Sequence, residues 1–179
     1  VQGSPFHYEG RDLEAMDVAV NYHAWILSTF DPYVGNHLLE IGAGTGAVSR
    51  MILDRYRKQT WLLEPSDMYL QLCRNISADA DGGRAYAVRG LLESQHDYLC
   101  RQSIDTVFYV NVLEHIEDDR AELARVFTLL EPGGHVLTFS PALPALFGPF
   151  DASVGHFRRY YLSEMKEKMT SAGFEVVRA

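Results

Sequence analysis

Apolar residues recur along the chain with two different periods, and the two kinds of segment alternate. Between residues 13 and 27 they stand three or four positions apart, which places them on one face of a helix. Further along, short apolar runs end in turn residues and are followed by further helical stripes. The pattern predicts helices that alternate with strands at residues 37–41, 60–64, 84–88, 104–110, 135–140 and 174–178.

The run from Ile104 to Val110 is almost uninterrupted in its apolar character, which is typical of a strand covered on both faces of a parallel sheet. Repeated alternation of strands and helices predicts the α/β class with a Rossmann-like, doubly wound, mostly parallel sheet. We expect one domain over residues 37–179, preceded by an N-terminal helical lid segment, residues 1–36. Ordinary core and surface roles are the alternative for the aromatic residues of that segment.

Composition narrows the classes of partner. Hydrophobic residues make up 47% of the chain and charged residues 22%, a globular balance, and the net charge is −8. That charge disfavours nucleic acid, because phosphate-backbone binding depends on Lys and Arg. Cys73 and Cys100 form no metal or redox spacing, and no apolar run approaches the ~20 residues that span a bilayer. We therefore expect a cytoplasmic protein that binds a small molecule, with no membrane contact.

Three glycines mark a turn between the first strand and its helix. Gly42, Gly44 and Gly46 lack side chains, so the backbone there can turn sharply and approach a ligand closely. With Ala47 in the last place the string also fits the dinucleotide fingerprint, and Glu64 closes the second strand where a ribose partner is expected. A phosphate-binding P-loop is excluded, because no Lys-Ser or Lys-Thr pair follows the glycines.

Glu40 separates the two remaining kinds of ligand. This carboxylate stands two residues before the first glycine, where a dinucleotide would bring a negative pyrophosphate. S-adenosylmethionine (SAM) instead brings an ammonium and a sulfonium group and no phosphate. Glu40 therefore favours the cationic ligand over NAD.

Several motifs together resemble class I SAM-dependent methyltransferases. They appear in the order and spacing of that family, which makes the resemblance more specific than one glycine loop. The matching strings are LLEIGAGTG at 38–46, LEPS at 63–66, NVLEHIED at 111–118 and LEPGGHVL at 130–137. The string GHFRRY at 155–160 further resembles a bacterial small-molecule methyltransferase branch.

The resemblance implies a set of cofactor-binding residues. The glycine loop would face the methionine part of SAM, with Glu40 near its amino group through water, and Glu64 would accept hydrogen bonds from the ribose hydroxyls. Adenine would be held near Leu91, because no acidic residue follows the third strand. The predicted set is Glu40, Gly42, Ala43, Gly44, Gly46, Glu64, Pro65, Leu91, Asn111 and Val112.

Methyl transfer from a sulfonium needs orientation more than a nucleophile, although an acceptor with a proton to lose needs a base. We expect His156 in that role rather than His115, with Arg158 binding an acidic group of the acceptor and Tyr160 forming an aromatic wall. The alternatives are a helix-start role for His115 and surface ion pairing for the arginine. Scattered histidines without a ligand spacing predict no metal site.

Two other functions stay open from the residues alone: an NAD-dependent oxidoreductase with the same loop, and a noncatalytic SAM-binding module. The family that the chain resembles has seven strands, the last one antiparallel, and this sequence stops after the sixth. We therefore expect a fold truncated before that last antiparallel strand, completed by further chain or by a homodimer contact.

Overall fold

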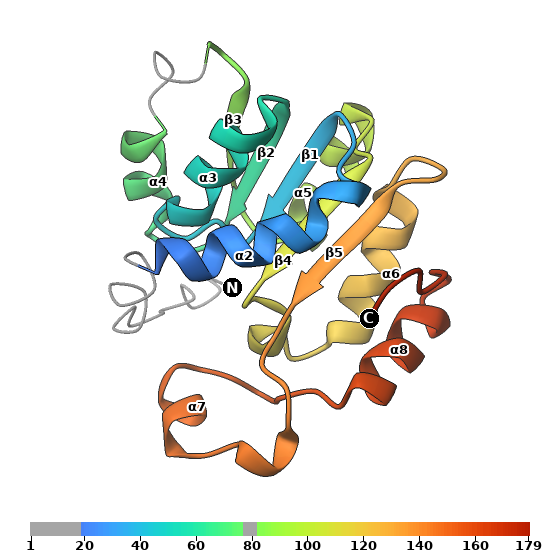
Figure 1. Cartoon of the computed structure of the whole chain (residues 1–179). Helices are drawn as coiled ribbons and strands as arrows, with labels where there is room; N and C mark the ends of the chain where they lie inside the picture. The colour runs from blue at the N-terminus through green and yellow to red at the C-terminus, as the bar shows by residue number, and fades with distance from the viewer. Residues whose placement is uncertain (1–18, 77–81) are drawn as a thin grey trace, which may run out of the picture.

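The computed structural model describes residues 19–76 and 82–179. Strands lie close to where the hydrophobic pattern places them, and they are β1 (His37–Ile41), β2 (Gln59–Glu64), β3 (Ala85–Arg89), β4 (Thr106–Val110) and β5 (His135–Phe139). They form a single five-stranded sheet in the order β3-β2-β1-β4-β5, and all four pairings are parallel (Figure 1). This order confirms the predicted doubly wound α/β fold.

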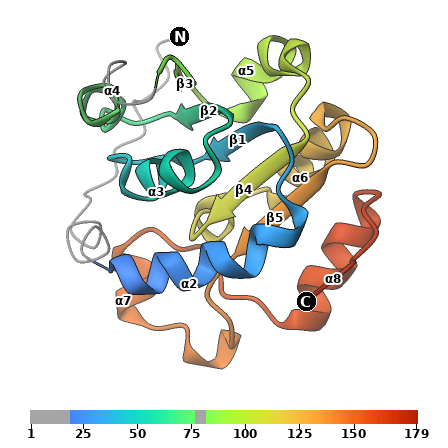
Figure 2. The ribbon, with the colours of Figure 1, turned by 45° about the horizontal axis from the view of Figure 1, so that its top comes forward.

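Helices cover both faces of the sheet, as the two views in Figures 1 and 2 show. One face is covered by α2 (Val20–Phe30), α3 (Ala47–Tyr56) and α4 (Tyr69–Asn75). On the other face lie α5 (Leu92–Leu99) and α6 (Asp119–Leu129), with α8 (Leu162–Ser171) beside α6. The shorter helices are η1 (Asp31–Tyr33), η2 (Cys100–Gln102), η3 (Leu113–His115), η4 (Pro144–Leu146) and α7 (Pro149–Ser153).

Side chains alternate between these two faces along each central strand. In β1, Leu38 packs with residues of α2 and α3, whereas Leu39 and Ile41 pack with the helices of the opposite face. In β4, Phe108 points to the first cluster and Tyr109 to the second. A parallel strand buried on both sides needs apolar residues at successive positions, which explains its nearly continuous hydrophobic run.

The topology brings three loops to one edge of the sheet. β1 pairs with β2 on one side and with β4 on the other, and Ile41 at its end is level with Leu63 and Tyr109. The chain direction around the sheet reverses at this point, where open α/β sheets bind their ligands beyond the carboxyl ends of the strands. The glycine loop therefore lies at the position expected for a binding site.

The predicted strand at 174–178 is wrong. This segment pairs with no strand in the described part of the chain; Phe174 and Val176 pack instead against the core beside α6, whereas Val177 is exposed. Phe174 meets Phe127 edge-on at 5.2 Å between ring centroids. Hydrophobic contact with a helix thus accounts for the apolar pattern without a backbone ladder.

The structure also changes the expectations for the N-terminal helix and for residues 141–161. Residues 13–18 of the predicted N-terminal helix lie outside the described residues, and α2 covers the rest of its range from Val20 onward. Residues 141–161 are less irregular than expected, since they contain η4, α7 and a bridge between Ala142 and Tyr160. No helix among the described residues is long and apolar enough to cross a membrane.

Candidate functional site

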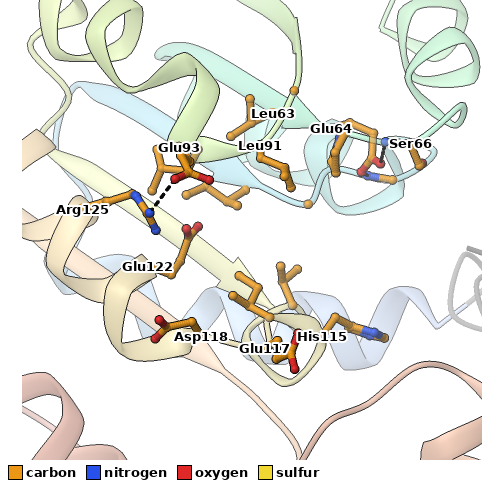
Figure 3. A pocket seen from close by; sticks show the side chains of 18 of the residues that line it. Leu63, Glu64, Ser66, Leu91, Glu93, His115, Glu117, Asp118, Glu122 and Arg125 are labelled. Carbon is orange, nitrogen blue, oxygen red and sulfur yellow. Dashed lines mark hydrogen bonds and ion pairs between the residues drawn. The ribbon is translucent and has the colours of Figure 1, made fainter. Parts of the chain in front are cut away.

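A cavity of about 450 Å³ opens at the carboxyl edge of the sheet. Its walls come from the loops that follow the first four strands, from the start of α6 and from one residue after α7, Phe157. In Figure 3, Glu64 and Leu91 lie on one wall, and Glu117, Asp118 and Glu122 lie on the wall that faces them. The cavity therefore gathers residues far apart in the sequence around the reversal point of the sheet.

The three glycines of the loop have positive φ angles, +73° at Gly42, +56° at Gly44 and +95° at Gly46. A Cβ atom at Gly42 would lie 2.6 Å from Cγ2 of Val112, and one at Gly46 would lie 2.9 Å from Cδ1 of Leu72. At Gly44 a Cβ atom would meet nothing within 4 Å. Gly42 and Gly46 are thus required by packing, whereas Gly44 borders open space in the cavity wall.

Glu64 ties the end of β2 to the glycine loop. Its carboxylate accepts hydrogen bonds from the backbone N–H groups of Gly44 and Ser66, each at 2.8 Å. The carbonyl of Leu63 accepts two more from the N–H groups of Gly42 and Ala43. The side chain of Glu64 is buried and still lines the cavity, so it fixes the loop and faces any ligand there.

Glu40 lies beneath the loop rather than in the cavity wall. It is buried, and its carboxylate accepts a hydrogen bond from the Ser49 hydroxyl of α3 at 2.5 Å. Burial raises the pKa of Glu40 to about 8, the Ser49 hydrogen bond opposes that rise and the nearby charge of Glu64 adds to it. Two carboxylates therefore lie close together below and beside the loop.

The structure brings most of the predicted cofactor residues to the cavity. Those that line it are Gly42, Gly44, Glu64, Pro65, Leu91, Asn111 and Val112. Glu40, Ala43 and Gly46 are not among the lining residues; Ala43 is buried in the cluster formed with α3 and α4. Asn111 directly follows β4 with a φ of +54°, and its N–H donates to the carbonyl of Phe139 at 2.7 Å.

Sequence reasoning missed the acidic wall opposite the loop. Burial raises the pKa of Glu122, which accepts a hydrogen bond from the Tyr109 hydroxyl at 2.7 Å. Arg125 also lines the cavity, but its guanidinium is paired with Glu93 at 3.0 Å (Figure 3). The sequence does carry a signal for this wall, the acidic run of Glu117, Asp118 and Asp119 at the start of α6.

Arg158 and Tyr160, predicted to contact the acceptor, do not line the cavity, and their polar groups are engaged elsewhere. The buried Tyr160 hydroxyl donates to the carbonyl of Leu113 at 3.0 Å and to Asp119 at 2.9 Å. The guanidinium of Arg158 lies 2.7 Å from the same Asp119 carboxylate, which also binds Lys168 at 2.6 Å. These groups join η3, α6 and α8.

Burial by itself would raise the pKa of Asp119, but the hydrogen bonds from Lys168, Arg158 and Tyr160 lower it overall. Asp119 is therefore the ionised centre of a structural network. Tyr160 and Arg158 have their polar groups turned toward it, which explains why neither is available at the cavity.

His156 lies beside the cavity, in contact with one of its lining residues. Its ring meets the ring of His115 edge-on, with 4.6 Å between centroids, and His115 lines the cavity. Nδ1 of His156 lies 3.0 Å from the buried carboxylate of Asp151. The next residue, Phe157, lines the cavity itself.

Comparison with known proteins agrees with the fold and with the position of the cavity. Residues 39–136 match the model of a family described as a methyltransferase domain. The chain belongs to this methyltransferase domain family. The matched range runs from β1 to the start of β5, so it contains the glycine loop, Glu64 and the segment after β4.

Individual relatives of the methyltransferase domain share its sequence only in part. An uncharacterized methyltransferase of Geobacillus kaustophilus is 33% identical over 135 residues, which are 72% of this chain and 57% of that protein. A Mycolicibacterium smegmatis protein, named as a probable S-adenosylmethionine-dependent methyltransferase, is 29% identical over 157 residues, 79% and 53% of the two chains. The chain thus spans a little over half the length of these relatives.

Among solved structures, phosphoethanolamine N-methyltransferase 2 of Haemonchus contortus in complex with S-adenosyl-L-methionine has a similar fold. The TM-score is 0.68 at 22% identity, and the match covers 86% of this chain and 36% of that one. At this identity the likeness establishes the fold and leaves the ligand to be argued from the site.

Proposed function

We propose that this methyltransferase domain binds SAM in the cavity at the carboxyl edge of the sheet and transfers its methyl group to a small-molecule acceptor. Membership of the methyltransferase family supports the reaction class. Bound SAM supplies a methyl group already activated on a sulfonium, so the residues of the chain have mainly to orient it and the acceptor.

The charge of the cavity carries the choice of cofactor. Carboxylates of Glu64 and Glu122 face the cavity from opposite walls. Glu40 below the loop adds little charge near neutral pH, because burial raises its pKa to about 8. The guanidinium that lines the cavity, that of Arg125, is paired with Glu93. This setting favours a cationic ligand and opposes the pyrophosphate of NAD, whose charge would meet carboxylates at close range.

The positions of the lining residues support a role for each part of the cavity. Gly44 allows close approach of a ligand, and Glu64 retains lone pairs for ribose hydroxyls while it holds the loop. Leu91 and Pro65 offer apolar surface for adenine. Asn111, directly after β4, would bind the methionine amino group. We propose the remaining predicted residues, Glu40, Ala43 and Gly46, as supports of the loop rather than as direct contacts.

The acceptor would enter beside His115 and Phe157, which line the cavity at the segment between β4 and α6 and after α7. While its Nε2 is free, His156 stays our proposed partner for a proton lost by the acceptor, through its contact with His115. A homodimer contact, predicted from the sequence, stays part of this proposal.

The test is binding followed by turnover. Calorimetry should show SAM and S-adenosylhomocysteine binding, and thermal stability should rise with either one but not with NAD. Labelled SAM incubated with the protein and a metabolite extract should yield a labelled product that mass spectrometry identifies. Stabilisation by NAD without SAM binding would refute the proposal, and SAM binding without any labelled product would indicate a noncatalytic module.

A further inference from the structure

Three side chains of kinds that can bind a metal ion lie together beside the cavity, near His115 in its wall. Glu114 and His115 lie in η3, and His156 comes from the segment after α7. One ligand atom from each of them lies within 4.8 Å of the other two. The fold has therefore brought a carboxylate and two imidazoles together from positions some forty residues apart.

Glu114 is the observation that points to a ligand. Its side chain is fully buried, and neither carboxylate oxygen meets the geometry of a hydrogen bond with a described residue; the Ser140 hydroxyl, which lies near it, is also unpartnered. Buried polar groups in native proteins are almost always partnered, and a buried charge is paired or bound to a metal. A cation between Glu114 and the histidines would satisfy both oxygens.

The second histidine is held in an orientation that suits a metal ligand. Nδ1 of His156 lies 3.0 Å from Oδ1 of Asp151, so that Nε2 is left for another partner. Asp151 is itself fixed by the N–H of Gly148 at 3.0 Å and by Nε of Arg159 at 2.7 Å. A carboxylate behind a histidine is the usual arrangement by which proteins orient a metal-binding imidazole.

Backbone contacts keep the two segments in register. The N–H of Phe157 donates to the carbonyl of Glu114 at 2.8 Å. Gly155 passes so close to His115 that a Cβ atom at this glycine would lie 3.8 Å from Nδ1 of His115. The three side chains are thus supported by the main chain on both sides of the cluster.

We propose that Glu114, His115 and His156 bind a divalent transition-metal ion, and that Zn²⁺ is the ion whose ligand preferences they match. Zn²⁺ binds imidazole nitrogen and carboxylate oxygen at ~2.0–2.2 Å, so two such donors are at most ~4.4 Å apart. The observed separations, all within 4.8 Å, exceed that range by a few tenths of an ångström at most, so the side chains would have to draw together on binding. Imidazole pairs disfavour Mg²⁺ and Ca²⁺, which prefer oxygen ligands.

Three protein ligands leave a coordination position open, as in catalytic rather than structural zinc sites. His115 is shared between the cluster and the cavity wall, so an ion held there would lie next to the acceptor. This part of the inference rests on the proposed function; the binding of the ion does not. The proposed metal site departs from the prediction of no metal site, which was based only on the spacing of histidines along the sequence.

The experiment measures Zn²⁺ binding to the whole chain after treatment with a chelator, by titration calorimetry and by competition with a chromophoric chelator. The wild-type protein should bind one ion. Glu114→Gln and His156→Gln should each weaken it by at least ~100-fold, because loss of an outer partner alone costs ~10- to 100-fold. Asp151→Asn should fall within that smaller range, and His135→Gln, outside the cluster, should bind as the wild type does.

SAM binding and circular dichroism are recorded on the same samples. Unchanged SAM affinity in Glu114→Gln together with lost Zn²⁺ binding supports the proposal and separates it from the cofactor site. Absence of Zn²⁺ binding by the folded wild-type protein would overturn it, whatever the variants do. Equal Zn²⁺ affinity in wild type and Glu114→Gln would overturn it as well, and neither result would affect the proposed SAM site.

Discussion

Replacing Glu64 by glutamine tests the junction between the glycine loop and the cavity. The carboxylate accepts hydrogen bonds from the N–H groups of Gly44 and Ser66, each at 2.8 Å. Glutamine keeps one acceptor oxygen but turns an NH₂ donor toward the other N–H. One buried N–H thereby loses its partner, which costs about 1–3 kcal/mol in the free energy of unfolding.

The same substitution should weaken SAM binding by more than the loop distortion alone. A hydrogen bond to a charged acceptor contributes about 1.5–3 kcal/mol, and each 1.4 kcal/mol changes affinity about tenfold. With the carboxylate charge lost beside the ribose, we expect the Kd for SAM to rise roughly 10- to 100-fold. Titration calorimetry on fully folded protein measures this, and urea unfolding measures the stability change separately.

Glu131→Gln is the matched control, because this exposed carboxylate stands in the turn before β5, at the amino edge of the sheet. It should change neither the unfolding free energy nor the SAM affinity. If Glu64→Gln lowers stability but binds SAM as tightly as the wild type, Glu64 only holds the loop, and its proposed ribose contact is refuted.

Four further substitutions test the glycine loop, the Asp119 network and the buried Glu40 separately. Gly44→Ala should weaken SAM binding at least about tenfold and lower the free energy of unfolding by about 1–2 kcal/mol, because its φ is positive. Gly46→Ala should lower the free energy of unfolding further, because its Cβ atom would also meet Leu72. A larger stability loss in Gly44→Ala than in Gly46→Ala would contradict the loop geometry. Arg158→Ala should lower the unfolding free energy by about 1–3 kcal/mol without raising the KM of an acceptor, and a raised KM at unchanged stability would restore its acceptor role. The pKa of Glu40 is raised from 4.5 to about 8 in the folded protein. Burial of Glu40 therefore costs no stability below about pH 4.5, where the carboxyl is protonated in both states, and it lowers the free energy of unfolding increasingly as pH rises from there toward about 8. Glu40→Gln should therefore gain on the wild type by up to about 5 kcal/mol between about pH 4.5 and about pH 8 in urea unfolding, and a constant difference over that range would contradict the shift.

The fold was predictable because its strands and helices are read from local periodicity. β1, β2 and β5 begin or end within one residue of the predicted positions, and the glycine turn falls between β1 and α3 as expected. The strand expected at 174–178 failed because apolar alternation reports burial alone. Phe174 is half-buried against Phe127, and no local signal says whether a neighbouring strand is present.

The cavity wall around the glycine loop was predictable for a similar reason, since Gly44, Glu64 and Asn111 lie at or just beyond the ends of parallel strands, which meet at the same edge. The acidic wall was not predictable. Glu122 reaches the cavity because α6 packs across the end of β4, where Tyr109 binds it. That contact depends on the packing of a helix that the sequence pattern locates but does not orient.

The segment GHFRRY shows how one string of polar residues divides between structure and site. Arg158 and Tyr160 satisfy Asp119, and Arg159 satisfies Asp151, because each carboxylate is buried and needs a partner. With those side chains committed, Phe157 is the part of the segment that lines the cavity, and His156 reaches it through His115. Any selection of the acceptor by this segment therefore depends on an aromatic surface and on the imidazoles beside it, which favours an acceptor with a flat apolar part over one recognised by its negative charge.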